Sequence, residues 1–496
     1  MAIDRRHFIG ATAATGAFTA AEAVAAPATA TTVPVSGLGV DAVHLGVRFN
    51  GSDDQTEALQ RAIDRLAGAR LPLILAPGIY RVRSLVLPTG TRLLGVPGAT
   101  RIVASDNTPL IVARGANHIL LSGIIFDGSG RNLPADAGLI QLAAGRAVAI
   151  RDCEIIGAGR NGIMLEDIEG EVVNTIVNGA LGAAIHALDS RALVIARNTI
   201  RNSANNGIQV WRSQAGDDGT QVIDNRIEDT LAAAGGSGQN GNAINVFRAH
   251  NVIVRGNRIR NAAFSAVRGN AASNIQVTNN ICTGLGEVAI YAEFGFEGAV
   301  IANNTIDGAA IGVAVTNFNH GGRLAVVQGN LIRNLLPKRP AGTDPNDGAG
   351  IGIGVEADTA VTGNIIENAP TAGISVGWGQ YLRDVSVTGN VVRGAGTGIA
   401  VSVSPGAGSA VIADNLISDI KSGAIVGMDR RKPMTGDLAR EGATRYAQLA
   451  INGNRVRKQR SHRKAAMRGS AVNASRAYSS LASGNSHTAC TPFGPN

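Results

Sequence analysis

The stretches Val361-Thr362-Gly363-Asn364-Ile365-Ile366 and Val387-Thr388-Gly389-Asn390-Val391-Val392 repeat one phrase. An aliphatic residue is followed by two variable residues, an asparagine, a variable residue and a second aliphatic residue. The phrase recurs from about residue 120 to residue 456, with most steps of 23–27 residues and insertions at steps of 32, 34 and 39. The repeated asparagines are Asn198, Asn225, Asn257, Asn280, Asn304, Asn330, Asn364, Asn390, Asn415 and Asn454.

A period of this length predicts a solenoid, in which every repeat forms one coil. A second phrase follows each asparagine, as in Gly207-Ile208-Gln209-Val210 and Gly373-Ile374-Ser375-Val376. We expect two or three short strands in each coil. No such strand buries its aliphatic face alone, but stacked coils share one continuous core. Long amphipathic runs, which helical solenoids need, are absent from the sequence.

The repeated asparagines are predicted to be structural rather than catalytic. An asparagine tolerates the left-handed conformation of a turn, and its amide can bond the equivalent amide on neighbouring coils. Such a ladder satisfies buried backbone groups at the turn. Asn174 fits the same register, and Cys153 stands in for the asparagine one coil earlier.

A helix is predicted before the repeats. Apolar residues at 59, 62, 63 and 66 recur at helical spacing, and Gly68 follows them. The acidic pair Asp53-Asp54 favours a helix N-terminus, and capping is a simpler role for it than metal binding. A strand over 71–75 and the segment Pro77-Gly78-Ile79-Tyr80 come next.

The net charge of +8 is concentrated at the carboxyl end. Residues 455–496 contain six Arg, two Lys and no acid, so the remainder is neutral and gives no reason to expect a nucleic acid partner. We divide the chain into a signal segment (1–30), a cap with the first coils (35–110), the repeats (111–456) and a basic tail (457–496). Cys153 and Cys282 lie five coils apart, which excludes a disulfide between them.

The first thirty residues have the features of an export signal. Arg5-Arg6-His7-Phe8-Ile9 precedes a short Ala- and Gly-rich stretch with several Ala-x-Ala sites. The segment resembles a bacterial twin-arginine signal, which implies passage through the twin-arginine translocase to the periplasm or the exterior. The apolar stretch is too short for a stable membrane anchor.

Residues 40–456, with the cap and the asparagine phrase, resemble the right-handed parallel β-helix repeat family. That family includes pectate lyases, polygalacturonases and alginate C5-epimerases. Joined to the twin-arginine segment, the pattern looks like exported repeat proteins of unassigned function. The resemblance implies an all-β, right-handed parallel β-helix with an N-terminal capping helix and a groove along one sheet face.

Strand alternation from the Gly-Ile-x-Val phrase predicts which side chains line that groove. The predicted substrate-binding residues are His186, Gln209, Trp211, Asn245, Phe247 and Arg248. Sugar rings pack on aromatic faces, and arginine pairs with carboxylates. Later coils present the small residues Ala314, Gly354, Ser375 and Ala400. The insertions Asp229–Asn242 and Asn334–Ala349 precede this strand, so we expect them to wall the groove.

The candidate catalytic residues are Arg268, Tyr291, Glu293 and His250. Abstraction of the C5 proton of a uronate needs a neutralised carboxylate and a base. Arg268 or Arg248 would neutralise, while Tyr291, His250 or His186 would move the proton and Glu293 would orient them. This predicts a protein that binds an acidic polysaccharide and cleaves or epimerises it.

Two other functions stay open, together with the question of whether the protein is an enzyme at all. The alginate-epimerase motif Asp-Pro-His-Asp and the Asp cluster of pectate lyases are missing, so no cofactor is evident and Ca²⁺ has no identified site. A non-catalytic glycan-binding or structural envelope protein is the alternative, favoured by the small residues. A glycoside hydrolase ranks lower, because Glu293 and Glu356 would lie about 10 Å apart.

Overall fold

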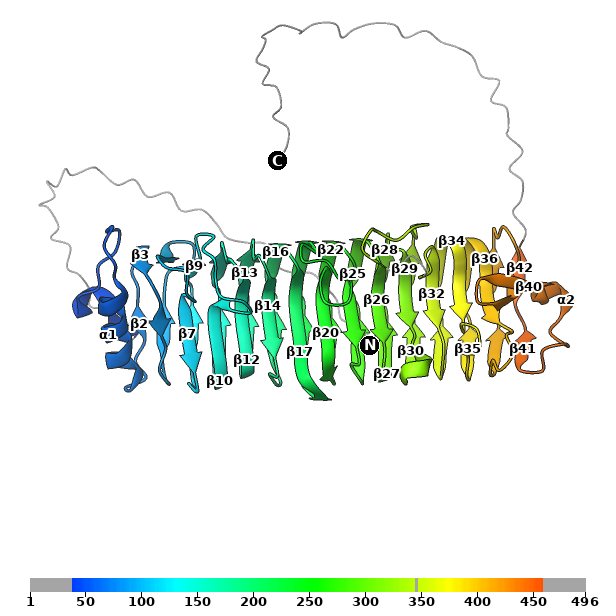
Figure 1. The fold of residues 1–496 in the computed structure, drawn as a ribbon, viewed down its shortest axis with the longest axis horizontal. Coiled ribbons are helices and arrows are strands. Elements are labelled where there is room, and N and C mark those ends of the chain that lie inside the picture. The colour runs from blue at the N-terminus through cyan, green and yellow to red at the C-terminus, as the bar shows by residue number, and fades with distance from the viewer. Residues whose placement is uncertain (1–37, 344–346, 458–496) are drawn as a thin grey trace, which may run out of the picture.

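The structure is a computed structural model that describes residues 38–343 and 347–457. The chain winds into a right-handed parallel β-helix of about 14 turns, which stand side by side along one axis (Figure 1). Three parallel sheets, here called A, B and C, run along the molecule, and the chain visits them in the order C, A, B in each turn. The predicted fold class is confirmed.

The strands of each sheet pair with the equivalent strands one turn away. Sheet A contains β4 (Leu85–Val86), β7 (Ile111–Arg114), β10 (Gly138–Arg151), β12 (Asn161–Val173), β14 (Ala183–Leu188), β17 (Asn206–Asp217), β20 (Asn242–His250), β23 (Val267–Asn270), β26 (Val288–Glu293), β29 (Ile311–Val315), β32 (Ile351–Val355), β34 (Ile365–Val376), β36 (Val391–Ser402) and β39 (Ile425–Asp429). Sheet B contains β1 (Val40–Asp41), β2 (Leu73–Ile74), β5 (Arg92–Leu94), β8 (Leu120–Ser122), the ends of β10 and β12, β15 (Val194–Ala196), β18 (Gln221–Ile223), β21 (Ile253–Arg255), β24 (Ile275–Thr278), β27 (Glu297–Ala302), β30 (Arg323–Gln328), β33 (Thr359–Thr362), β35 (Val385–Thr388), β37 (Ala410–Ala413) and β41 (Leu449–Asn452). Sheet C contains β3 (Gly78–Val82), β6 (Thr100–Ala104), β9 (Ile125–Asp127), β11 (Glu154–Ile156), β13 (Ile176–Asn178), β16 (Thr199–Ser203), β19 (Arg226–Thr230), β22 (Arg258–Ala262), β25 (Ile281–Leu285), β28 (Thr305–Asp307), β31 (Leu331–Arg333), the first parts of β34 and β36, β38 (Leu416–Ser418) and β42 (Arg455–Arg457).

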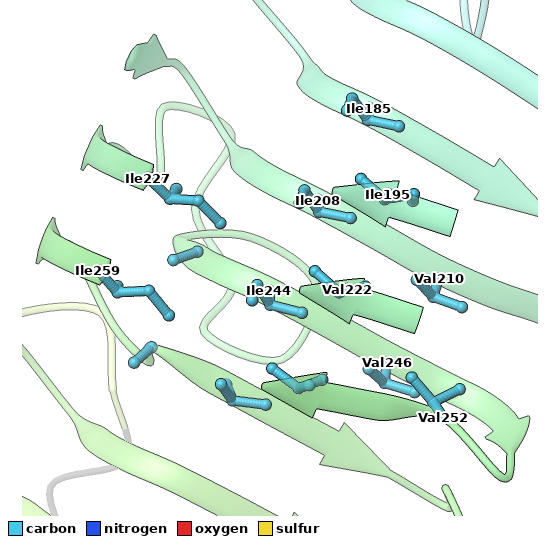
Figure 2. Close-up of a cluster of buried hydrophobic side chains, with 14 of the residues drawn as sticks. Ile185, Ile195, Ile208, Val210, Val222, Ile227, Ile244, Val246, Val252 and Ile259 are labelled. Carbon is cyan, nitrogen blue, oxygen red and sulfur yellow. The ribbon is translucent and has the colours of Figure 1, made fainter. Parts of the chain in front are cut away.

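One aliphatic core fills the interior between the three sheets. Figure 2 shows Ile208 of sheet A, Val222 of sheet B and Ile227 of sheet C pointing into the same space, with equivalent residues one turn away. All three are fully buried. Burial of one such side chain contributes about 1.5–3 kcal/mol, so stability accumulates turn by turn.

The asparagine ladder lies at the corner between sheets B and C. From Asn225 onward, each amide oxygen accepts both the backbone N–H and the side-chain amide of the asparagine one turn before. Asn304 Oδ1, for example, accepts from Asn280 N at 2.9 Å and from Asn280 Nδ2 at 3.0 Å. The Asn304 amide donates to Val277 O at 2.9 Å and to Asn330 Oδ1 at 3.0 Å. Nine of the ten predicted asparagines are buried, and Asn454 at the end is half-buried. The ladder prediction is confirmed.

The expected backbone conformation of the ladder was wrong by one residue. None of the ten asparagines has a positive φ; the residue before each of them does, as in Asn279 (φ 58°) and Gly363 (φ 66°). The left-handed residue turns the corner, and the asparagine after it points inward to its neighbours. For the same reason Asn174 (φ 52°) is a corner residue, and Thr175 occupies the ladder position between Cys153 and Asn198.

The predicted cap is present. Helix α1 (Thr56–Ala67) buries Leu59, Ile63 and Leu66 against the first turn, next to the short helix η1 (Ala42–Leu45) (Figure 1). Asp54 Oδ1 accepts from the Thr56 backbone N–H at 2.8 Å, and Asp53 pairs with Arg48. The acidic pair therefore serves the helix start and local ion pairs.

The other end of the core is covered by an insertion in the last turn. Strand β40 (Lys432–Asp437) pairs with β39 in the antiparallel sense, and helix α2 (Leu438–Glu441) follows (Figure 1). The Leu438 side chain is buried. An antiparallel strand on the last parallel strand protects the open edge of sheet A from pairing with another chain.

Cys153 and Cys282 are free and buried, as expected. The twin-arginine segment 1–30 and, apart from Arg457, the basic tail lie outside the described residues. The predicted boundary at residue 110, between the cap with the first coils and the repeats, stays a prediction. Strand pairs such as Leu85 with Ile111 join residues on its two sides. Within residues 38–343 and 347–457, no helix is long and apolar enough to cross a membrane.

We expect Asn304→Ala to destabilise the protein by about 3 kcal/mol or more, because it leaves the Asn280 donors and the Val277 carbonyl unpaired in the interior. Asn274→Ala is the matched control, since Asn274 is an exposed corner residue whose side chain bonds only to Asn251 among the described residues. Urea unfolding followed by circular dichroism would measure the difference. Equal midpoints for the two variants would show that the ladder adds no stability.

Candidate functional site

The predicted register of sheet A is confirmed. Successive strands place Gln209, Asn245, Arg268, Tyr291, Ala314, Gly354, Ser375 and Ala400 opposite one another in one outward column. The second outward column passes through Trp211, Phe247, Asn270 and Glu293. The face of the sheet was therefore predicted correctly, residue by residue.

The predicted exposure of the middle of this face was wrong. Gln209, Asn245, Arg268 and Glu293 are all buried, with Asn245 and Glu293 only 2% exposed. The insertion before β20 lies over the sheet: Asn245 donates to Gly238 O at 3.0 Å. The insertion before β32 approaches from the same corner and carries Arg339. Both insertions contact sheet A as expected, but over the middle turns they cover it.

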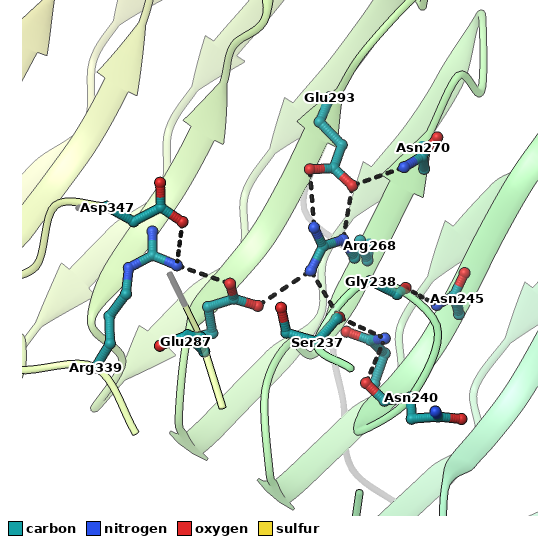
Figure 3. A network of polar contacts seen from close by, with 12 residues as sticks. Ser237, Gly238, Asn240, Asn245, Arg268, Asn270, Glu287, Glu293, Arg339 and Asp347 are labelled. Atoms are coloured by element: carbon teal, nitrogen blue, oxygen red, sulfur yellow. Dashed lines mark hydrogen bonds and ion pairs between the residues drawn. The ribbon is translucent and has the colours of Figure 1, made fainter. Parts of the chain in front are cut away.

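A chain of alternating charges joins the two insertions to sheet A (Figure 3). Arg268 Nε and Nη2 donate to the two Glu293 oxygens at 2.7 and 2.9 Å, and Arg268 Nη1 reaches Glu287 at 3.1 Å and Ser237 O at 2.7 Å. Glu287 accepts from Arg339 Nη1 at 2.7 Å, and Arg339 lies 3.3 Å from Asp347.

This network contradicts the catalytic roles expected of Arg268 and Glu293. Every nitrogen of the Arg268 guanidinium already donates within the protein, and both Glu293 oxygens accept from it. A buried, fully paired arginine has no donor pair left for a substrate carboxylate. Arg268 instead holds the first insertion against the sheet through Ser237, and Glu293 balances its charge.

The aromatic residues of the middle turns pack on one another. The ring centroids of His186 and Trp211 are 5.2 Å apart, those of Trp211 and Phe247 are 5.9 Å apart, and Arg248 lies 4.7 Å from the Phe247 ring centroid. Trp211 Nε1 donates to Asn245 Oδ1 at 3.1 Å. Burial lowers the pKa of His186 to about 4, so this imidazole is neutral at neutral pH.

The remaining two candidates are separated in space. His250 lies at the corner after sheet A, where its carbonyl accepts from Asp218 N at 3.1 Å, beyond the left-handed residue Arg248. No contact in the described part of the chain joins it to Tyr291. The Tyr291 ring lies under the Arg268 guanidinium at 4.9 Å, and burial, together with the Glu293 carboxylate, raises the pKa of its phenol. A phenol that holds its proton this firmly is a poor base.

The open cleft lies further along the same face, over the turns with small residues. Two adjoining cavities of about 360 and 660 Å³ share Arg339, Asp347, Ile351, Ser375 and Trp378. Their floor comes from four positions of the predicted outward column, namely Ala314, Gly354, Ser375 and Ala400. In the sequence analysis these small residues favoured a non-catalytic protein. In the structure they leave room for the cleft above the sheet.

The walls of the cleft come from both edges of sheet A. Residues 337–341 and 347–349 of the second insertion form one wall, and Trp378 with Met428, Arg430 and Arg431 forms the other. Trp378 is 38% exposed. Four cationic side chains line the larger cavity against a single carboxylate, Asp347; they are Lys338, Arg339, Arg430 and Arg431.

The smaller cavity contains Glu356, the residue after β32, beside Tyr291 and Thr316. Glu356 Oε2 accepts from the Phe318 backbone N–H at 2.8 Å. Burial raises the pKa of the Glu356 carboxyl to about 6, against the backbone donors of Phe318 and Asn317. Among the described residues, no group of three or more His, Cys, Asp or Glu side chains is arranged to hold a metal ion.

Sequence reasoning named Glu356 only as a distant partner of Glu293, and it missed Trp378, Lys338, Arg339, Arg430 and Arg431. A signal for most of them was present. Trp378 stands between Gly377 and Gly379 directly after a strand, which marks a large side chain on a turn. Arg430 and Arg431 lie in the longest asparagine step, from Asn415 to Asn454, which is an insertion like the other two.

We expect Arg268→Ala to destabilise the protein by about 3–5 kcal/mol, because it leaves Glu293 buried without a cation and leaves Glu287 with Arg339 as its one remaining cation among the described residues. The control is Arg393→Ala, since Arg393 pairs with Glu367 and Asp419 at a side-chain exposure of 63%. Its loss would cost about 1 kcal/mol or less. Urea unfolding compares the two, and a similar small loss for both would refute a structural role of the network.

Known structures with a similar fold come from several kinds of protein. A pre-mature bacteriophage phi29 gene product 12 aligns over 85% of this chain at 14% identity and a TM-score of 0.48; the chain spans 57% of its length. The A-module of the mannuronan C-5 epimerase AlgE6 from Azotobacter vinelandii aligns over 77% of this chain and 98% of its own, at 16% identity and a TM-score of 0.44. PfbA, a surface adhesin of Streptococcus pneumoniae, aligns over 85% and 94%, at 15% identity and a TM-score of 0.45.

No protein with a curated description matches this sequence. A family does match: the family described as the right handed beta helix region matches residues 100–227 and 213–392, which is more than half of the chain. The winding of the backbone and the stacked turns agree with that description. The chain therefore belongs to the right-handed β-helix family.

Proposed function

We propose that this protein binds an acidic polysaccharide in the sheet A cleft. The observation that carries the proposal is the lining of the larger cavity, where the exposed ring of Trp378 stands among Lys338, Arg430 and Arg431, while Arg339 is paired with Glu287 and Asp347. Aromatic rings pack against the apolar faces of sugars, and arginines pair with carboxylates and sulfates. An excess of positive charge in a cleft favours anionic ligands.

The shape of the cleft supports a polymer rather than a small molecule. The two cavities adjoin along the axis, and their lining runs from Tyr291 of β26 to Met428 of β39. A ligand that fills both contacts several successive turns of the solenoid. Together they reach the upper end of the usual range for small-ligand pockets, about 1,000 Å³.

We expect Trp378→Ala to weaken binding of an acidic polysaccharide about tenfold or more, because a large aromatic contact at the ligand is lost. Trp211→Ala is the matched control: it removes the other of the two Trp residues, which lies outside the cleft. Alginate, polygalacturonate and a glycosaminoglycan would serve as probes, with dextran as the neutral control.

The two tryptophans, Trp211 and Trp378, also provide a fluorescence measurement of binding. In a Trp211→Phe variant, Trp378 is the only indole, so its fluorescence reports ligand binding directly. Arg430→Ala should weaken binding and reduce its dependence on salt concentration. Equal affinity for charged and neutral polymers, or loss of binding in Trp211→Ala alone, would contradict the proposed site.

We also propose that the protein is exported to the periplasm or the exterior through the twin-arginine translocase. Arg5-Arg6-His7-Phe8-Ile9, followed by the Ala-rich stretch, supports this. Replacing Arg5 and Arg6 together by Lys should retain the full-length chain in the cytoplasm, which cell fractionation would detect. Export of the Lys-Lys variant at the rate of the unaltered chain would contradict the route.

A further inference from the structure

We propose that Glu356 is the proton donor of a glycoside hydrolysis reaction in the sheet A cleft, with Asp347 as the base that activates water. The inference rests on the proposed polysaccharide binding and adds a reaction to it. It concerns the smaller cavity, where Glu356 and Asp347 both contribute to the lining.

The surroundings of Glu356 differ from those of the other acids of this face. Glu293 and Glu287 are paired with arginines, as is Asp347. Glu356, half-buried in the cavity wall, has no Lys or Arg within ion-pair distance among the described residues, and backbone N–H groups are its only described donors. A carboxyl that is buried without a cation keeps its proton more readily than one that is paired.

The Glu356 side chain is fixed by the segment around Phe318, which packs on the side away from the cavity. The Phe318 N–H that donates to it starts the short helix η2 (Phe318–His320), directly after the left-handed residue Asn317. The Arg383 guanidinium covers the Phe318 ring at 4.4 Å. Arg383 in turn donates to Asp358 at 2.8 Å, so its charge is directed to that carboxylate rather than to Glu356.

Asp347 has the opposite environment. Its carboxylate lies 3.3 Å from Arg339, and its side chain is 43% exposed to solvent. Two carboxyl groups in one cavity, one with a pKa that burial raises and one open to solvent beside a cation, fit the two roles that hydrolysis of a glycosidic bond needs.

The reaction balances with these two groups and one water. The Glu356 carboxyl gives its proton to the glycosidic oxygen as the bond from the anomeric carbon to that oxygen breaks, and the bonding electron pair stays on the oxygen. A water oxygen bonds to the anomeric carbon, and its proton passes to Asp347. Proton exchange with solvent returns both side chains to their starting forms.

C5 proton abstraction, the reaction expected from the sequence, has less support in this cavity. It needs a strong base at C5 and a cation free to neutralise the uronate carboxylate. Tyr291 holds its proton, because burial and Glu293 raise its pKa. Arg339 is the only cation that lines the smaller cavity in the described part of the chain, and Glu287 and Asp347 already engage it.

Glu356→Gln in the full-length protein is the central test. It keeps the shape and removes the transferable proton, so the release of reducing ends from the bound polysaccharide should fall about 100-fold or more. Binding, measured by Trp378 fluorescence in the Trp211→Phe background, should change less than about twofold, since a lost proton affects the transition state more than the ground state. Glu166→Gln is the control, because Glu166 is an exposed carboxylate on the same sheet.

A pH profile separates a proton donor from a merely structural residue. Wild-type hydrolysis should decline as pH rises through about 6, where Glu356 loses its proton, while binding does not follow the same curve. The charged or titratable groups around this carboxyl are Tyr291, Arg339 and Asp347 in the cavity, and Arg383 and Asp358 behind Phe318. Asp347→Asn should abolish hydrolysis and leave the thermal stability of the protein nearly unchanged.

The outcomes distinguish this inference from the proposed function. An unsaturated product that absorbs in the ultraviolet would overturn hydrolysis in favour of elimination. Undiminished release of reducing ends by Glu356→Gln would overturn the role of Glu356. Binding without cleavage of any of the probe polysaccharides would overturn the inference and leave the binding function intact, whereas no binding at all would refute both.

Discussion

The contact between like residues on successive turns is the constraint on which this molecule depends. Most strands of the three sheets are too short to be stable alone, and each is held by the equivalent strand one turn away. The asparagine corner fixes the register of that stacking, because each amide meets the next at 2.9–3.0 Å. A slip of one residue would break the corner and turn the aliphatic side chains toward solvent.

A spiral held in this way accepts extra residues only at its corners. The three long insertions occur at the two corners that flank sheet A: residues 231–241 and 335–350 before its strands, and 430–448 after them. All three therefore shape the same face. The chain of charges from Asp347 to Glu293 connects two of them to the sheet, the first through Arg268 and the second through Arg339.

The fold could be predicted almost completely from the sequence. Residues that contact their equivalents one turn away must recur at the period of the turn, so the repeat itself reveals the contacts. Asn280, Ile208 and the capping helix were all placed correctly. The site could be predicted only in register. Whether Arg268 or Ser375 is open to solvent depends on loops that cross several turns, and the repeat carries no information about their path. The sequence also placed Asn174 in the ladder, because it is an asparagine near the expected position. The ladder position is taken by the next residue, Thr175, whose hydroxyl can bond at the same turn.

The burial of the two cysteines within the described residues determines their reactivity. Cys282 is completely enclosed by the aliphatic core, and burial raises its pKa and that of Cys153 to about 12. Thiols that neither ionise nor reach solvent are inert toward oxidants and toward other thiols. The packing of the described solenoid therefore does not depend on oxidation of these two thiols.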